Sequence, residues 1–251
     1  MKCASLCLSE LTLPGTHQAL LERVIRLPGV GPETPILDLG CGSGAWLNRL
    51  AEHGFKKSHG VDNESFVTLP QGPLPFSCSA ADLDQNPDLG LGDAKFGLIT
   101  AIEVIEHVRN PGRLLRHVSR HLADNGYFLL TTPNVHSVRA RIRFALTGKL
   151  AGFDPTNVPA EPTHLYPVFL ICLDRLLSQY RLKVVDTWTF PPDRGRGSRP
   201  LARLAALFLA MVLPDPYPGD TLCVLIRHAR ANRGRSSTNG NSNTTTVNET
   251  R

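Results

Sequence analysis

The fold is decided by the stretch Ile36-Leu37-Asp38-Leu39-Gly40-Cys41-Gly42-Ser43-Gly44. Its first four residues predict a short buried β-strand, and the glycines that follow predict a tight turn that admits left-handed backbone angles. The next segment, Ala45 to His53, carries Trp46, Leu47 and Leu50 on one side, which predicts a helix. A strand, a glycine turn and a helix in this order are typical of a parallel α/β sheet.

The same alternation continues on both sides of this unit. A helix is predicted before it, at Thr16 to Leu27, and another after Asn110-Pro111, a pair that suits a helix N-cap and first position. This pattern predicts an α/β fold with a doubly wound, mostly parallel sheet. A second strand is predicted to end at Gly60-Val61-Asp62, and further strands are predicted near Phe76 to Ala80 and at Phe96 to Ala101, Tyr127 to Thr132, Leu182 to Thr189 and Thr221 to Arg227.

Composition and charge narrow the class of protein. The 251 residues are 41% hydrophobic, which suits one large globular domain. The longest apolar run, Leu204 to Leu213, has ten residues, about half of what a membrane-spanning helix needs. The net charge of +5 lies mostly after residue 226, in a polar segment, so nucleic acid is not the favoured partner. We therefore expect one domain over residues 1–231 and a disordered tail over 232–251.

Three acidic residues follow the predicted strands and indicate the ligand. Asp62 comes 22 residues after Gly40, where a carboxylate accepts hydrogen bonds from ribose hydroxyls. Asp38 precedes the glycine turn, where it would repel a pyrophosphate but attract an ammonium group. Asp82, beside the apolar Leu83, offers an acceptor for an adenine amino group. The set favours S-adenosylmethionine over NAD, so a dehydrogenase is the weaker alternative.

These segments together resemble a known family. Residues 36–44 are similar to the first motif of class I S-adenosylmethionine-dependent methyltransferases, and Gly60-Val61-Asp62 to the second. Ala101 to Val108, Asn110-Pro111 and Gly126 to Asn134 resemble later motifs of the branch that includes the ubiquinone-biosynthesis O-methyltransferases.

The resemblance extends from Pro35 to Trp188. It implies a Rossmann-like, seven-stranded sheet whose last strand is antiparallel, and S-adenosylmethionine as the cofactor. The residues expected to line the cofactor site are Asp38, Gly40, Cys41, Gly42, Asp62, Asn63, Asp82, Leu83, Ala101 and Glu103.

Methyl transfer needs few catalytic groups, because the sulfonium is a good leaving group and the protein mainly aligns the reactants. His107 is the predicted general base, since it follows the fourth strand and histidine titrates near neutral pH. A histidine that only orders this loop is an equal alternative. His164 and Tyr166 are weaker candidates, from a segment expected to return to the mouth of the site.

The same region raises the question of a metal ion. On a helix, Glu103, Glu106 and His107 would share one face, and His164 would complete four ligands suitable for a divalent ion. A similar quartet occurs in small-RNA 3′-terminal methyltransferases, whose flanking sequence differs from this one. The Glu-x-x-Glu-His string also occurs in metal-free relatives, so the predicted site contains no metal.

The segment near 135–165 is predicted to be an insertion with a basic amphipathic helix. Val138, Ile142 and Leu146 are spaced by four, and arginines lie between them. An apolar block at Pro200 to Leu213 follows later. Relatives that methylate quinones or lipid-linked sugars carry insertions in similar places, so the resemblance implies a small or lipid-linked acceptor, with methylation expected at oxygen.

The expected location is cytoplasmic, and the scattered cysteines suit reduced thiols. Contact with the inner membrane face is the alternative to burial of the two segments within the domain. The competing functions are a metal-assisted RNA 2′-O-methyltransferase and a non-catalytic scaffold for a membrane or partner.

Overall fold

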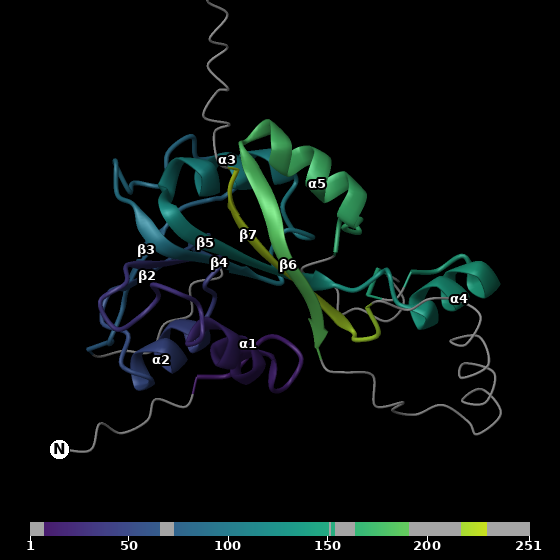
Figure 1. Cartoon of the computed structure of the whole chain (residues 1–251), viewed down its shortest axis with the longest axis horizontal. Coiled ribbons are helices and arrows are strands. Elements are labelled where there is room, and N and C mark those ends of the chain that lie inside the picture. The colour runs from purple at the N-terminus through teal and green to yellow at the C-terminus, as the bar shows by residue number, and fades with distance from the viewer. Residues whose placement is uncertain (1–7, 66–72, 151, 154–163, 191–216, 230–251) are drawn as a thin grey trace, which may run out of the picture.

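The protein is a seven-stranded sheet with helices on both faces (Figure 1). The structure, a computed structural model, describes residues 8–65, 73–150, 152–153, 164–190 and 217–229. The strands are β1 (Ile36–Leu39), β2 (Ser58–Asp62), β3 (Ser77–Ala80), β4 (Phe96–Ile102), β5 (Leu122–Pro133), β6 (Leu182–Phe190) and β7 (Thr221–His228). The helices are α1 (Thr16–Val24), α2 (Ala45–Glu52), α3 (Pro111–His121), α4 (Val138–Thr147) and α5 (Leu170–Gln179).

The strand order is β3-β2-β1-β4-β5-β7-β6. The first five strands are parallel, and β7 is antiparallel to both β5 and β6. The predicted sheet, with its antiparallel last strand, is confirmed. The direction of winding reverses between β1 and β4, and ligands of such sheets bind beyond the carboxyl ends of the strands at this point.

Each face of the sheet has its own apolar core. Leu20 and Leu21 of α1 pack with Trp46 and Leu47 of α2 on one face. On the other face, α3 and α5 contribute their buried leucines to a second cluster. Figure 1 shows the two helix pairs on opposite sides of the strands. The sheet is thus covered on both faces, as its largely apolar strands require.

Most predicted elements are present, with three differences. Helix α1 ends at Val24 rather than Leu27. Strand β5 begins at Leu122, five residues before the predicted start at Tyr127. Helix α5 was not predicted. The predicted N-cap is confirmed, because the Asn110 side chain accepts a hydrogen bond from the Arg113 N–H.

The predicted amphipathic helix exists as α4, and the Ser137 hydroxyl caps it by accepting from the Ala140 N–H. Its apolar face packs only at the first turn: Val138 is buried, whereas Leu146 is 80% exposed. Figure 1 shows α4 beside the sheet rather than across it. The block at 200–213 and the tail at 232–251 lie outside the described residues. Among those described, no helix is long and apolar enough to cross a bilayer.

Candidate active site

The glycine turn follows β1 at the point where the winding reverses. Gly40, Gly42 and Gly44 have φ values of 79°, 50° and 76°, a region that side chains strongly disfavour. A Cβ atom at Gly40 would also overlap the Val104 side chain. The turn therefore lies directly against the segment that follows β4, and only glycine fits at its first position.

Asp62, at the end of β2, holds this turn in place. Its Oδ2 accepts a hydrogen bond from the Gly42 N–H at 2.7 Å, and its Oδ1 accepts from the Asn63 N–H at 2.7 Å. Burial raises the pKa of Asp62, and the two backbone bonds partly oppose that rise. Each carboxylate oxygen retains a second lone pair, so the group can still accept from a ribose.

Asp38 is 3% exposed and lies opposite Thr100 in the sheet. The Thr100 hydroxyl donates to Asp38 Oδ1 at 2.6 Å, and the Trp46 Nε1–H donates to the same hydroxyl oxygen at 3.2 Å. Burial, with a smaller contribution from the charge of Asp62, raises the pKa of Asp38 to about 8. A ligand cation would stabilise its ionised form. Sequence analysis missed Thr100, although a lone hydroxyl in an apolar strand was a signal.

Asp82 and Asn63 lie at the same edge. Asp82 Oδ1 accepts hydrogen bonds from the Asp84 and Gln85 N–H groups at 2.8 and 3.2 Å, so this carboxylate caps its own turn. The Asn63 Nδ2–H donates to Asp82 Oδ2 at 3.4 Å and links the ends of β2 and β3. Leu83 is 8% exposed and packs into the core.

The remaining predicted cofactor residues are less available to a ligand. Ala101 on β4 is fully buried, so its side chain serves the core. Cys41 is 6% exposed and packs on Gly60. Glu103 accepts a hydrogen bond from the Thr131 hydroxyl at 3.0 Å, and burial raises its pKa to about 7.

The segment after β4 forms turns, so the expectation that Glu103, Glu106 and His107 share a helical face was wrong. Glu103 has a φ of 54°, and its N–H donates to the Thr131 hydroxyl at 3.0 Å, which directs its side chain toward β5. Ligand atoms of Glu106, His107 and His164 nevertheless lie within 4.8 Å of one another. Three of the four proposed metal ligands are thus brought together.

Glu106 is the buried member of this cluster, with 0% exposure. Neither of its carboxyl oxygens has a hydrogen bond of regular geometry among the described residues, although the Thr132 hydroxyl and its own backbone interact with the carboxyl group. Burial, and next the charge of Glu103, raise its pKa well above the usual range. The rings of His107 and His164 meet edge to face at 4.7 Å. One carboxylate and two imidazoles could hold a divalent ion or move a proton.

Backbone contacts bring the second segment over the cluster. The N–H groups of Leu165 and Tyr166 donate to the Glu106 carbonyl oxygen at 2.7 and 3.3 Å. His164 also contacts the Gly152 carbonyl oxygen through Nδ1. Tyr166 is 47% exposed at the surface. The predicted return of this segment to the site is therefore present in the structure.

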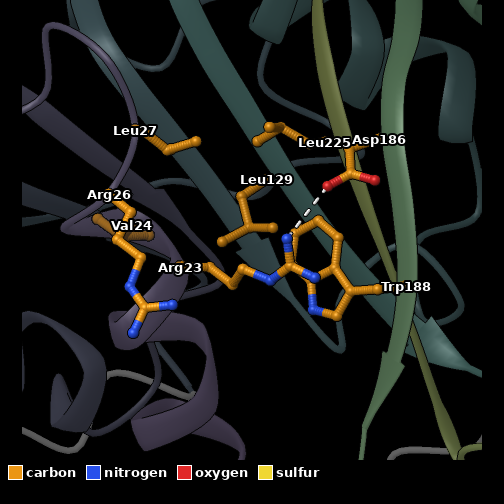
Figure 2. Close-up of a pocket in the computed structure, with 8 residues that line it drawn as sticks. All are labelled: Arg23, Val24, Arg26, Leu27, Leu129, Asp186, Trp188 and Leu225. Carbon is orange, nitrogen blue, oxygen red and sulfur yellow. Dashed lines mark hydrogen bonds and ion pairs between the residues drawn. The ribbon is translucent and has the colours of Figure 1, made fainter.

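A separate cavity of about 170 Å³ lies between α1 and the sheet (Figure 2). The Arg23 guanidinium stacks over the Trp188 ring at 4.6 Å and pairs with Asp186 at 3.3 Å. This ion pair and stacking contact fasten α1 to β6. No predicted cofactor residue lines the cavity, whose lining residues are Arg23, Val24, Arg26, Leu27, Leu129, Asp186, Trp188 and Leu225.

Several known proteins similar to this chain are methyltransferases, which is consistent with the fold and the glycine turn described above. Residues 15–186 match the family model described as a methyltransferase domain. A ubiquinone biosynthesis O-methyltransferase from Coxiella burnetii is 30% identical over 141 residues, which cover 54% of this chain and 56% of that protein. A mitochondrial one from Saccharomyces cerevisiae is 29% identical over 116 residues, covering 41% and 35%. The chain thus spans only about half the length of the curated relatives it matches.

Solved structures share the fold. An S-adenosylmethionine-dependent methyltransferase from Archaeoglobus fulgidus has a TM-score of 0.57 at 20% identity, covering 84% of this chain and 94% of that one. One from Mesorhizobium loti has a TM-score of 0.55 at 22% identity, covering 86% and 100%. The family model matches more than half of the chain, so the chain belongs to the methyltransferase domain family, and its strand order gives it the fold of these S-adenosylmethionine-dependent methyltransferases.

Proposed function

We propose that the chain transfers a methyl group from S-adenosylmethionine to a hydroxyl oxygen of a small or lipid-linked acceptor, within one domain over residues 1–231. Asp62 would bind the cofactor ribose, Asp38 its ammonium group and Asp82 its adenine amino group. The observation that carries the placement is the glycine turn, which Asp62 ties to the end of β2 through the Gly42 N–H. Glycine turns of this kind let a ligand approach the backbone closely.

His107 is the proposed general base. Its loop touches the glycine turn through Val104, and His164 and Glu106 surround it. As the acceptor oxygen attacks the methyl carbon in line with the carbon–sulfur bond, His107 would take the hydroxyl proton. The C–S bond breaks, and S-adenosylhomocysteine leaves as a neutral thioether. A general base of this kind contributes about 100- to 10,000-fold in rate.

The choice of oxygen and of a lipid-linked acceptor rests on two further observations. The relatives above are named for O-methylation in ubiquinone biosynthesis. Helix α4 carries Phe144 and Leu146, which are 51% and 80% exposed, and Arg139, Arg141 and Arg143 precede them in the same helix. An exposed apolar and basic helix suits a lipid tail or a peripheral contact with an anionic membrane face. Replacing both residues with serine should reduce binding to anionic vesicles without changing cofactor affinity.

The test supplies purified protein with S-adenosylmethionine and a catechol probe, 3,4-dihydroxybenzoate, and measures S-adenosylhomocysteine. We expect product from the catechol and a loss of about 100-fold in His107→Gln. Asn63→Ala, a change outside the proton path, should raise KM for the cofactor more than it lowers kcat. No product from either the catechol or RNA would overturn the proposal and favour the non-catalytic scaffold.

A second candidate is metal-assisted 2′-O-methylation of RNA. The observation in its favour is the cluster of Glu106, His107 and His164, whose carboxylate and imidazole donors suit a divalent ion. The Glu106 oxygens, which have no hydrogen bond of regular geometry among the described residues, fit such an ion. When bound, the ion would polarise the acceptor oxygen and replace the base role of His107.

The two candidates predict opposite responses to a chelator. Catechol methylation that survives EDTA supports the metal-free mechanism. Methylation of an RNA 3′ end that is lost with EDTA and restored by Mg²⁺ or Mn²⁺ supports the second candidate. Calorimetry of Mn²⁺ with wild type and Glu106→Gln tests the ion site independently of activity.

A further inference from the structure

Two cysteines meet at the glycine turn. Cys41 is part of that turn, and Cys78 lies on the edge strand β3, yet their Sγ atoms are 3.9 Å apart. Both are free thiols, and Cys78 is partly exposed. Gly60 of β2 lies between them. A Cβ atom at Gly60 would be only 2.6 Å from the Cys41 Sγ, and Cys78 is paired with Gly60 in the register of β2 and β3. The absence of a side chain at Gly60 therefore lets the two sulfurs meet across β2.

We propose that Cys41 and Cys78 form a peroxide-sensitive dithiol, whose oxidation to a disulfide displaces the glycine turn and weakens binding of S-adenosylmethionine. A disulfide requires a sulfur–sulfur distance of about 2 Å. The gap of 3.9 Å must therefore shorten by almost half. The Cys41 and Gly40 N–H groups donate to the Val61 carbonyl oxygen at 3.3 and 2.7 Å, so a shift of Cys41 pulls on the bonds that hold the turn.

The chemistry balances with a peroxide as the oxidant. The Cys78 thiolate attacks a peroxide oxygen, the O–O bond breaks, and a sulfenic acid and hydroxide form. The Cys41 sulfur then attacks the Cys78 sulfur, the S–O bond breaks, and the Cys41 proton leaves with the departing hydroxide as water. Two thiols are oxidised, and hydrogen peroxide is reduced to two waters. Cys78 is partly exposed whereas Cys41 is buried, so a peroxide reaches Cys78 first, and the hydrogen bond between the two thiols lowers the pKa of Cys78.

The linkage can be detected directly. Trypsin cuts after Lys and Arg, so it releases Cys41 in residues 27–49 and Cys78 in residues 58–95. After treatment with hydrogen peroxide, mass spectrometry should find these two peptides joined and 2 Da lighter than their sum. The exposed Cys172 serves as an internal measure of general oxidation.

The functional test is calorimetry with S-adenosylmethionine before and after oxidation. We expect Kd to rise about tenfold or more, because binding sites tolerate displacements of only about 0.5 Å, and dithiothreitol should restore it. Cys78→Ser should bind like the reduced wild type and resist peroxide, whereas Cys172→Ser should respond like wild type. The proposal is overturned if peroxide oxidises Cys172 without joining the two peptides, or if they join and Kd stays within twofold.

This inference rests on the proposed place of the cofactor at the glycine turn, and Asp62→Ala separates the two claims. If Asp62→Ala binds S-adenosylmethionine as tightly as wild type, the placement fails. If Asp62→Ala binds weakly but oxidised wild type does not, the placement stands and the dithiol proposal fails.

Discussion

Replacing Asp38 with asparagine tests the most specific electrostatic feature of the site. The asparagine side chain would have nearly the same shape and could still accept the hydrogen bond from Thr100, which Asp38 accepts at 2.6 Å. Only the ability to become an anion is removed. Because burial raises the pKa of Asp38 to about 8, the wild-type carboxyl is mostly neutral at pH 7. A ligand ammonium that pairs with it must first displace its proton.

The loss of binding free energy that comes from removing this proton follows from the pKa of Asp38. One pH unit below a pKa corresponds to about 1.4 kcal/mol, or a factor of ten in affinity. Wild-type affinity should therefore fall about fivefold between pH 8 and pH 7, where half of the carboxyl is already ionised at the start, and about tenfold more by pH 6. Above pH 8 the gain levels off, and there the Asp38→Asn variant should bind more weakly by about 1.5–3 kcal/mol, the usual value for a charged hydrogen bond.

The assay is calorimetry of S-adenosylhomocysteine at pH 6, 7, 8 and 9 with both proteins. The amine of the ligand titrates equally in both experiments, so the ratio of the two affinities isolates Asp38. Measurements in two buffers of different ionisation enthalpy should show about 0.9 protons released at pH 7 by wild type alone. An affinity ratio that does not change between pH 6 and 9 would refute the reasoning.

The same pKa predicts how stability without ligand depends on pH. A carboxyl whose pKa is raised in the folded state holds its proton more tightly there than in the unfolded chain. Its contribution to the free energy of unfolding is complete below about pH 4 and is lost as the pH rises toward 8. Relative to wild type, Asp38→Asn should thus gain thermal stability from pH 5 to pH 9, as followed by circular dichroism.

Three other variants test separate parts of the account. Asp62→Ala should weaken S-adenosylmethionine binding by about 1–3 kcal/mol in calorimetry, and an unchanged Kd would remove this carboxylate from the site. Gly40→Ala, which combines a φ of 79° with overlap of Val104, should abolish binding or lower the free energy of unfolding by about 2–4 kcal/mol. Gly29→Ala has the same φ in open space and is the matched control, so equal losses would exclude a role for the overlap. Arg23→Ala should lower the free energy of unfolding, measured in urea, by about 1 kcal/mol, because the ion pair of Arg23 is half exposed and its stacking contact is modest. A loss above about 3 kcal/mol would mean that α1 depends on this contact far more than the geometry indicates.

Local sequence predicted the first strand, the glycine turn and the second helix because all their determinants lie within a few residues. Helix α5 lacks a local start signal, because its N-cap, Phe169, has no capping side chain. Instead, the Leu170 N–H donates at 3.1 Å to Nε2 of His136, a residue 34 positions earlier. Leu170, Leu173 and Leu177 lie at helical spacing and were a signal for the helix itself, but the residue at which it begins depends on this distant side chain.

In the candidate site, too, local sequence predicted some features, whereas others depend on contacts between distant segments. The position of Asp62 at the end of β2 followed from its spacing, but its bond to Gly42 depends on how β1 and β2 are aligned. The shared helical face considered for Glu103, Glu106 and His107 is absent, because Thr131, on the neighbouring strand, holds Glu103 in a left-handed conformation. Contacts between strands decide both features, and sequence spacing does not encode them.

The central claim is that the glycine turn and Asp62 bind S-adenosylmethionine. Its most direct test is calorimetric titration of the reduced wild-type protein and Asp62→Ala with S-adenosylmethionine, with NAD in a parallel experiment. The account predicts saturable binding of S-adenosylmethionine at one site, a weaker Kd in Asp62→Ala and no heat from NAD. Binding of NAD alone, or equal affinity in the two proteins, would contradict it.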